Sequence, residues 1–443
     1  MPSSRRPRHH RRRWPWIAAA VVLLGAGVAL GAYFAFFQPE GDVSHPNVEF
    51  TAPTAPAQKP RVGETFIWPI YGYDDQRTRF LDVNLHPPFT NIWVYKAGGL
   101  IEFQPVLANG VLFFTKNEGV TSAISAKTGH LKWKRKVGSL NASSPAYFHG
   151  RIYQVLLSQK IVCLNAKNGK IVWKRNLPSR SESSPIVIKG VVYFGSENGT
   201  VYAMRADNGK ILWTYHASGA VKAGLAFNPA SGNLYFGDYS GEFYAIRRQN
   251  GKQVWRASTS SLAFGQSGNF YATPSVAYGR VFAGNTDGRV YSFAASSGKL
   301  AWRQSTGNYV YSAAAVGRPA GMGPTVFVGS YDGNFYALDA KSGNTIWKYS
   351  AGGKISGAPT VIGHIVYFSN LANKTTIGLN VKNGHPVFKS VHGAFNPVIS
   401  DGKRLYLTGY SSEFAFVPKA QAKAAQAKAK APKARSRGQA KSK

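Results

Sequence analysis

The chain has 443 residues and a formal net charge of +35, from 54 lysines and arginines against 19 aspartates and glutamates. The length is more than a single compact core usually needs, and one cysteine excludes an intrachain disulfide. A charge this positive predicts anionic partners.

The N-terminal residues predict a membrane anchor. Residues 1–13 contain six arginines and no acid, and residues 14–37 carry no charge. Such an apolar stretch can span a bilayer as a helix, and basic residues remain on the cytoplasmic side. We therefore expect a basic cytoplasmic segment (1–13), a single-pass anchor in the cell membrane (14–37) and the rest of the chain outside. A cleaved signal peptide is the alternative, but its apolar core is normally shorter.

Two short segments follow the apolar stretch. Residues 38–62 contain five prolines among threonine, alanine and glutamine, which is typical of a semi-stiff stalk. Residues 68–79 begin with Trp68 and include Asp74 and Asp75, which could suggest a metal site. Because Arg77 and Arg79 lie beside these carboxylates, a solvated surface ion cluster is the favoured interpretation.

Most of the remaining chain consists of one repeated unit. In residues 328–347 a strand leads to a tight turn at Asp332-Gly333, then to a second strand, a second turn and a third strand ending at Trp347. Copies end at other tryptophans, 40 to 47 residues apart. Four short strands in each such interval indicate a β-propeller blade.

The strand count also predicts how the ring closes. After Phe388 the chain has material for three strands only, the last at residues 413–417. Residues 91–95 form an unpaired strand near the start, with Trp93 in phase with the later tryptophans. Pairing the two gives eight complete blades and leaves no open edge. We therefore predict an all-β, eight-bladed propeller over residues 63–418.

The repeat has a family resemblance. The pattern Gly-Ser-x-Asp-Gly-x-x-Tyr-Ala-Leu-Asp-Ala-x-x-Gly-x-x-x-Trp, taken from residues 329–347, resembles the repeat of the pyrroloquinoline-quinone-like (quinoprotein-type) β-propellers. That group includes quinone-dependent alcohol dehydrogenases and an outer-membrane assembly lipoprotein that binds no quinone. The resemblance covers roughly residues 93–416, and residues 68–79 look like the Trp-rich segment that precedes many of these propellers. It implies that the outer-strand tryptophans dock against neighbouring blades: Trp93, Trp133, Trp173, Trp213, Trp255, Trp302 and Trp347.

Candidate binding residues come from the expected mouth of the central channel. Several inner strands are marked by a proline, and the residues three positions earlier, with rough equivalents, should surround the mouth. The candidates there are Glu102, Glu182, Lys222, Tyr271 and Tyr311, with Ala142, Ser356 and Ala394. They could hold a polar ligand, or they could pair with one another at a wet channel entrance. Glu182 is the only one considered for a metal, and we expect neither a metal site nor catalytic residues.

The quinone enzymes have further requirements that this sequence does not meet. By resemblance, they need two adjacent disulfide-bonded cysteines, an aspartate base, and a glutamate and an asparagine on calcium. Cys163 alone cannot supply the disulfide, and no base or calcium pair can be assigned. No cofactor is therefore expected, with pyrroloquinoline quinone (PQQ) and calcium as the alternative. Cys163 lies on an apolar strand, which favours a buried small hydrophobe over a reactive thiol.

The C-terminal tail differs in composition from the repeats. Residues 419–443 contain nine alanines and nine lysines or arginines, with no acid. We expect a disordered polycation that binds anionic polymers without specific nucleic-acid recognition. Taken together, the sequence resembles the non-catalytic assembly-factor-like propellers more than the dehydrogenases. It predicts a monomeric, membrane-anchored extracytoplasmic scaffold for envelope proteins or anionic polymers. The alternative is a quinone-dependent dehydrogenase-like enzyme with its site in the channel.

Overall fold

The computed structural model describes residues 19, 21–28, 41–51, 62–259 and 268–430, which belong to two units. The first unit comprises residues 1–41 and 260–266, and in it residues 21–28 are helical. Among the described residues, no helix is both long enough and apolar enough to cross a bilayer. Most of the predicted anchor at 14–37 lies outside the described residues.

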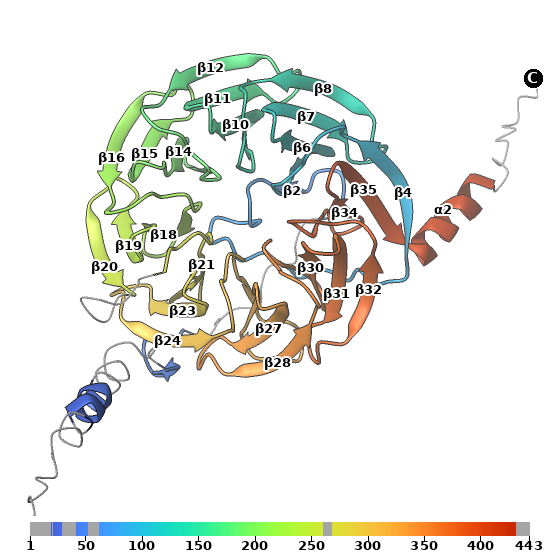
Figure 1. Cartoon of the computed structure of the whole chain (residues 1–443). Coiled ribbons are helices and arrows are strands. Elements are labelled where there is room, and N and C mark those ends of the chain that lie inside the picture. The colour runs from blue at the N-terminus through green and yellow to red at the C-terminus, as the bar shows by residue number, and fades with distance from the viewer. Residues whose placement is uncertain (1–18, 20, 29–40, 52–61, 260–267, 431–443) are drawn as a thin grey trace, which may run out of the picture. The chain divides into compact units, whose positions relative to one another are not determined.

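The second unit is a ring of eight β-sheets (Figure 1). We number the blades in chain order and the strands of each blade from the channel outward. Blades 1 to 4 contain β5 (Val106–Ala108), β6 (Val111–Lys116), β7 (Val120–Ser125) and β8 (Leu131–Lys136); β9 (Ala146–Phe148), β10 (Arg151–Leu156), β11 (Lys160–Asn165) and β12 (Ile171–Asn176); β13 (Ile186–Ile188), β14 (Val191–Phe194), β15 (Thr200–Arg205) and β16 (Ile211–His216); β17 (Ala226–Asn228), β18 (Asn233–Gly237), β19 (Glu242–Arg247) and β20 (Gln253–Ser258).

Blades 5 to 8 continue the same order around the ring. They contain β21 (Ser275–Ala277), β22 (Arg280–Gly284), β23 (Arg289–Ala294) and β24 (Leu300–Ser305); β25 (Ala315–Gly317), β26 (Thr325–Gly329), β27 (Asn334–Asp339) and β28 (Thr345–Ser350); β29 (Thr360–Ile362), β30 (Ile365–Asn370), β31 (Thr375–Asn380) and β32 (Pro386–Ser390); β33 (Val398–Ser400), β34 (Leu405–Thr408), β35 (Ser412–Pro418) and β4 (Phe89–Lys96). The all-β fold with eight four-stranded blades is confirmed.

The repeated Asp-Gly turn is built by its own side chains. Gly333 has φ = +83°, which an L-residue with a side chain rarely adopts. The Asp332 carboxylate accepts hydrogen bonds from the Asn334 amide at 2.8 Å and from the Tyr336 hydroxyl at 2.5 Å. The aspartate and the tyrosine of the repeat therefore hold the β26–β27 hairpin together, which is an architectural role.

Each of the seven predicted tryptophans contacts the blade that follows its own. The indole Nε1 of Trp133, for example, donates to the Ala166 carbonyl in blade 2 at 2.9 Å. Its ring also lies against Gly169 of the same turn, where a Cβ would come within 2.5 Å of the indole. The other six indoles make the same pair of contacts with the next blade, from Trp93 with Ala126 and Gly129 to Trp347 with Val381 and Gly384.

The ring closes by pairing a strand from each end of the chain. β4 runs antiparallel to β35, with Trp93 opposite Ala415 and Tyr95 opposite Glu413. In Figure 1 the blue β4 lies beside the red β35. The predicted closure is confirmed, and blade 8 contains both N-terminal and C-terminal residues.

Two segments differ from their predictions. Residues 42–51 pack on the propeller, where the sequence predicted a stalk: β1 (Val43–Ser44) pairs with β24, and Val48 and Phe50 join a core cluster between blades 5 and 6. At the other end, α2 (Lys419–Lys430) is helical where we expected disorder, because it consists only of alanine, lysine and glutamine, which all have high helix propensity. Residues 52–61 and 431–443 lie outside the described residues.

Candidate binding site at the channel mouth

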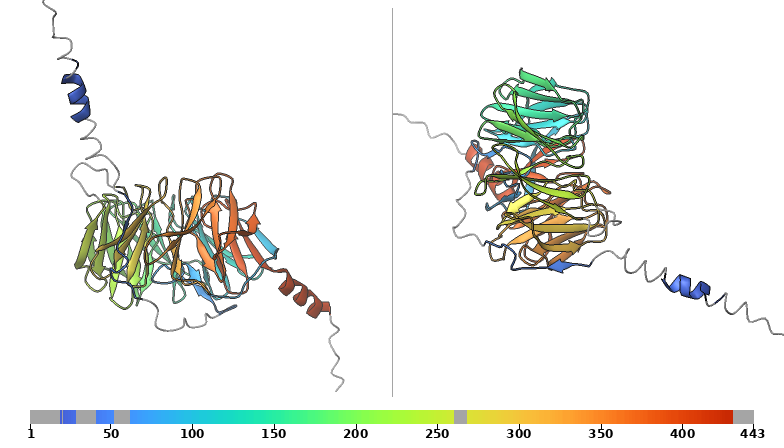
Figure 2. Two further views of the ribbon diagram at one scale, coloured as in Figure 1. Left: turned by 90° about the horizontal axis from the view of Figure 1, so that it is seen from below. Right: turned by 90° about the vertical axis from the view of Figure 1, so that its left-hand side faces the viewer.

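The strands of each blade run between the two faces of the ring, which Figure 2 shows from the side. We call one face the mouth face. It carries the loops between blades and the hairpins between the second and third strands. The opposite base face carries the hairpins between the first and second strands and those between the third and fourth. The predicted site residues lie in loops between blades and therefore on the mouth face.

The structure brings all five predicted mouth residues together. Glu102, Glu182, Lys222, Tyr271 and Tyr311 line one cavity of about 80 Å³ on the mouth face. Ser356 also lines it, and Ala142 and Ala394 do not. Each candidate comes from the loop that leads into a different inner strand, which is why residues 40 or more positions apart in the chain converge here.

Three of these side chains are paired with one another. The Lys222 ammonium donates to Glu182 Oε1 at 2.8 Å, and the Tyr271 hydroxyl donates to Glu182 Oε2 at 3.1 Å. Lys222 also lies 3.6 Å from Glu197 on the neighbouring hairpin. Burial, and next the Glu182 carboxylate, raise the pKa of Tyr271, so this phenol remains a hydrogen-bond donor at neutral pH. The sequence left two alternatives for the mouth residues, a polar-ligand site or mutual pairing. For these three residues the geometry shows mutual pairing.

Glu102 has a different environment. Its Oε2 accepts a hydrogen bond from Asn117 at 2.9 Å. Burial raises the pKa of Glu102, while the Asn117 hydrogen bond lowers it and the charge of Glu182 raises it further. Glu102 is therefore protonated more easily than an exposed glutamate.

An arc of tyrosines extends from the cavity across blades 4 to 6. The ring of Tyr271 contacts those of Tyr239 and Tyr311, with centroid distances of 6.2 and 5.4 Å, and Tyr311 contacts Tyr331 at 4.8 Å. Lys222 lies over the Tyr239 ring at 5.2 Å. Tyr239 and Tyr331, which lie in hairpins between second and third strands, were not predicted. Their place directly before the repeated turn was the available signal.

Beneath this cavity, the chain itself runs along the inner strands of the channel. Residues 67–81, which we call the channel segment, include β2 (Ile67–Trp68), paired with β5, and β3 (Phe80–Leu81), paired with β29. Between them, carbonyls accept hydrogen bonds of 2.7–2.9 Å from inner-strand amides: Pro69 from Tyr147, Asp75 from Phe227, Gln76 from Val276, Thr78 from Val316 and Arg79 from Val361. These contacts supply acceptors for inner-strand amides that face the channel.

Two arginines of the channel segment are fully buried. Arg77 donates to the carbonyls of Leu225 at 2.9 Å and Ser184 at 3.1 Å, and to that of Tyr71. Burial, and then the charge of Arg79, lower the pKa of Arg77 to about 9, so it remains cationic at neutral pH. Arg79 lies under the Tyr71 ring, which forms part of the cavity above.

The interpretation of residues 74–79 as a solvated ion cluster is wrong. Arg77 and Arg79 have no exposed surface, and their guanidinium groups are directed at carbonyls. Asp74 instead caps the turn by accepting from the Thr78 amide at 2.8 Å and the Thr78 hydroxyl at 2.5 Å. In the described part of the chain, no three His, Cys, Asp or Glu side chains group as metal ligands.

The mouth residues do not fit a tricyclic quinone. Pockets for small molecules usually hold about 300–1,000 Å³, several times the volume of this cavity. The channel segment occupies the space below it, and Cys163 is buried in β11 of blade 2, where burial raises the pKa of its thiol. The arrangement offers instead a polar, aromatic surface on which a larger partner could rest.

Comparisons with known proteins agree with this architecture. The crystal structure of BamB from Moraxella catarrhalis is 17% identical and superposes with a TM-score of 0.62, covering 74% of this chain and 99% of that one. A quinohemoprotein alcohol dehydrogenase from Comamonas testosteroni is 14% identical (TM-score 0.66; 80% and 81% covered), and a europium-containing methanol dehydrogenase is also 14% identical (0.66; 79% and 98%). At these identities the likeness shows the fold alone.

The sequence itself identifies the family. No curated protein sequence matches the chain. The family model described as outer membrane protein assembly factor BamB matches residues 116–314 and 286–430, which together cover most of the propeller. The repeats, the eight-bladed ring and this match agree, and the chain belongs to the BamB family of pyrroloquinoline-quinone-like β-propellers.

Proposed function

We propose that this protein is a membrane-anchored, extracytoplasmic scaffold whose propeller binds envelope proteins or anionic polymers. The observation that carries the proposal is the channel segment. Because it covers inner strands on the channel side, the faces and the rim of the ring are the surfaces that we expect a large partner to use. Family membership supports the same role, since the family is described by an assembly factor.

The anchor and its orientation are part of the proposal. The six arginines before residues 14–37 favour a cytoplasmic N-terminus and an external propeller. Protease added to intact cells or protoplasts should cleave the propeller and leave residues 1–13 protected. A propeller that is protected until lysis would place it inside and overturn this topology.

A quinone-dependent dehydrogenase is the competing function, and a titration separates the two. Purified full-length protein is mixed with calcium and pyrroloquinoline quinone, and both absorbance and melting temperature are followed. We expect no saturable absorbance change, no rise in melting temperature and no dye-linked oxidation of alcohols or sugars. A saturable, calcium-dependent quinone spectrum would favour the enzyme.

The scaffold role needs its own test. Site-specific photocrosslinkers at Tyr239 and Tyr331 on the mouth face and at Lys189 on the base face, in full-length protein in intact cells, should give discrete adducts with envelope components. Crosslinkers at Lys252, in the outer turn of blade 4, provide a comparison. Equal, diffuse labelling from all positions would argue against a scaffold with defined binding surfaces.

A further inference from the structure

The protein covers two of its own base-face grooves with N-terminal residues. In the groove between blades 5 and 6, Arg280 at the start of β22 donates to the carbonyls of Glu49 and Pro46 and lies over the ring of Phe50. In the groove between blades 8 and 1, Arg404 just before β34 donates to the Glu64 carboxylate at 2.6 Å. Both arginines are buried, with 0% and 8% exposure.

A third groove has the same arginine, and none of the described residues before Phe148 lines it. Phe148-His-Gly-Arg151 of blade 2 matches Ala277-Tyr-Gly-Arg280 of blade 5 in sequence and place, because β10 begins at Arg151 as β22 begins at Arg280. Between blades 2 and 3 this leaves a pocket of about 500 Å³. Arg151 is partly exposed there and donates to the Asp207 carbonyl at 3.3 Å. In residues 62–259 and 268–430 it forms no ion pair with a carboxylate.

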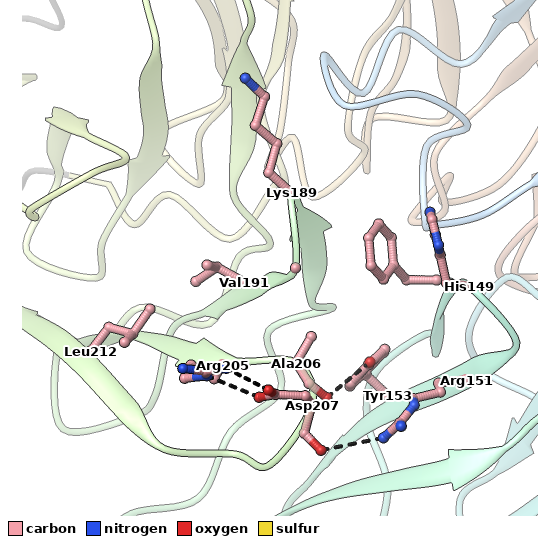
Figure 3. A pocket seen from close by; sticks show the side chains of 11 residues that line it. His149, Arg151, Tyr153, Lys189, Val191, Arg205, Ala206, Asp207 and Leu212 are labelled. Atoms are coloured by element: carbon pink, nitrogen blue, oxygen red, sulfur yellow. Dashed lines mark hydrogen bonds and ion pairs between the residues drawn. The ribbon is translucent and has the colours of Figure 1, made fainter.

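The pocket is cationic with apolar walls. Figure 3 shows Arg151, Arg205 and Asp207 close together, with His149 and Lys189 above them in the view and the Lys189 amino group directed away from them. Arg205 pairs with Asp207 at 2.6 Å, which leaves the charges of Arg151 and Lys189 without a carboxylate partner among the described residues. Phe148, Val191 and Leu212 supply the apolar surface.

The blade 5 groove shows what such a surface accommodates. There, β1 adds an extended strand to the outer edge of β24, Ser44 donates to the Ser342 carbonyl of blade 6 at 2.7 Å, and the Glu49 carboxylate accepts from the Ser296 amide at 3.1 Å. The residue in the place of Ser296, two before the turn glycine, is Lys167 in blade 2. A carboxylate on an extended chain would therefore meet more positive charge in blade 2 than it does in blade 5.

We propose that the groove between blades 2 and 3 binds an extended, acidic segment of a partner protein in the manner in which residues 42–51 bind between blades 5 and 6. This inference rests on the proposed scaffold function and names its binding surface and the chemistry of its partner. An added strand supplies backbone hydrogen bonds, and the cations select an acidic sequence.

A synthetic peptide with the sequence of residues 41–51 is the probe. The full-length protein keeps its own copy in the blade 5 groove, so added peptide should bind one-to-one between blades 2 and 3, and more weakly as salt rises. Arg151→Gln should weaken binding about tenfold or more, because a charge-assisted hydrogen bond is lost. Lys189→Gln, whose exposed side chain should not affect folding, should weaken it about threefold. Lys252→Gln, an exposed cation in blade 4, should leave the affinity unchanged, and a peptide with Glu49→Gln should bind less well to the wild-type protein.

Three outcomes would overturn the inference. The peptide could fail to bind the wild-type protein, or bind all variants equally because it exchanges with residues 41–51 between blades 5 and 6. Arg151→Gln could instead change the sedimentation of the protein alone, which would make a second copy of this chain the occupant. A failure of the proposed scaffold function would give another result. The crosslinkers would then capture no defined partner, even though the peptide binds to the groove. If the Tyr239 and Tyr331 crosslinkers capture a defined partner while the peptide fails to bind the wild-type protein, the scaffold function stands and the groove between blades 2 and 3 is not its surface.

Discussion

The contact between a tryptophan and a glycine of the next blade can be tested by adding one methyl group. Gly169 has φ = +68°, and a Cβ there would lie 2.5 Å from Trp133 Cε3. Gly150 of the same blade has φ = +77° and nothing within 4 Å of its Cβ position. Gly150→Ala therefore measures the backbone cost alone, while Gly169→Ala also displaces the indole.

The expected costs follow from these geometries. An alanine at positive φ costs about 1–2 kcal/mol. At Gly169 the displaced indole also loses part of its packing, at about 1–3 kcal/mol, and its 2.9 Å hydrogen bond to Ala166, at about 1 kcal/mol. We expect Gly169→Ala to lower the free energy of unfolding by about 3–6 kcal/mol, against about 1–2 kcal/mol for Gly150→Ala.

A double-mutant cycle shows whether the indole is the cause. In a Trp133→Ala background the added methyl group no longer meets a ring, so Gly169→Ala should cost only as much as Gly150→Ala. Urea unfolding followed by circular dichroism and intrinsic fluorescence gives the four values. Equal costs for the two glycine variants, or a Gly169→Ala cost that Trp133→Ala does not reduce, would refute the proposed contact.

Three further predictions concern closure, pH and the tail. Trp93→Ala should cost about 3–5 kcal/mol in unfolding free energy, and deleting residues 84–99 should expose the edge of β35 and cause aggregation detectable by light scattering; a monodisperse deletion variant with unchanged melting temperature would contradict this. Burial raises the pKa of Glu413 well above its usual range, so the folded state holds this proton more tightly than the unfolded chain. Stability should fall as pH rises from the unfolded pKa through the folded one, and Glu413→Gln should remove that part of the fall in pH-dependent unfolding; parallel pH profiles for the two proteins would count against it. Truncation after Pro418 should weaken retention on heparin and reduce its salt dependence without changing the melting temperature; equal retention at low salt would reject a role for the tail.

The blades and the mouth residues could be predicted from the sequence because each depends on a short sequence pattern. An Asp-Gly turn specifies its hairpin whatever lies around it, and a recurring tryptophan sets the phase of every blade. The position of Glu182 and Tyr271 then follows from their distance to an inner-strand proline. Closure could be predicted because the last blade lacked one strand and residues 91–95 had no other partner.

The paths of the N-terminal segments could not be predicted in the same way. Arg77 donates hydrogen bonds to carbonyls of other blades. Because every residue has a backbone carbonyl, the sequence does not show which carbonyls an arginine will bind. In sequence, Arg77 and Arg79 beside Asp74 and Asp75 look like a surface ion cluster. Only the three-dimensional arrangement of the inner strands shows that the two arginines are buried. Residues 41–51 have the composition of a linker, yet Pro46 and Phe50 contact Arg280, a partner more than 200 positions away.

The channel segment also bears on how the propeller folds and unfolds. In repeat arrays each unit contacts only its neighbours, so such proteins can lose structure one unit at a time. Here residues 67–81 contact inner strands or the loops leading into them in blades 1 to 7, and β4 ties blade 8 to the same part of the chain. Opening one blade therefore disturbs contacts shared with the others, which favours cooperative, all-or-none unfolding. During synthesis, residues 67–96 emerge long before most of their partners, so the ring can be completed only after β35 has been made.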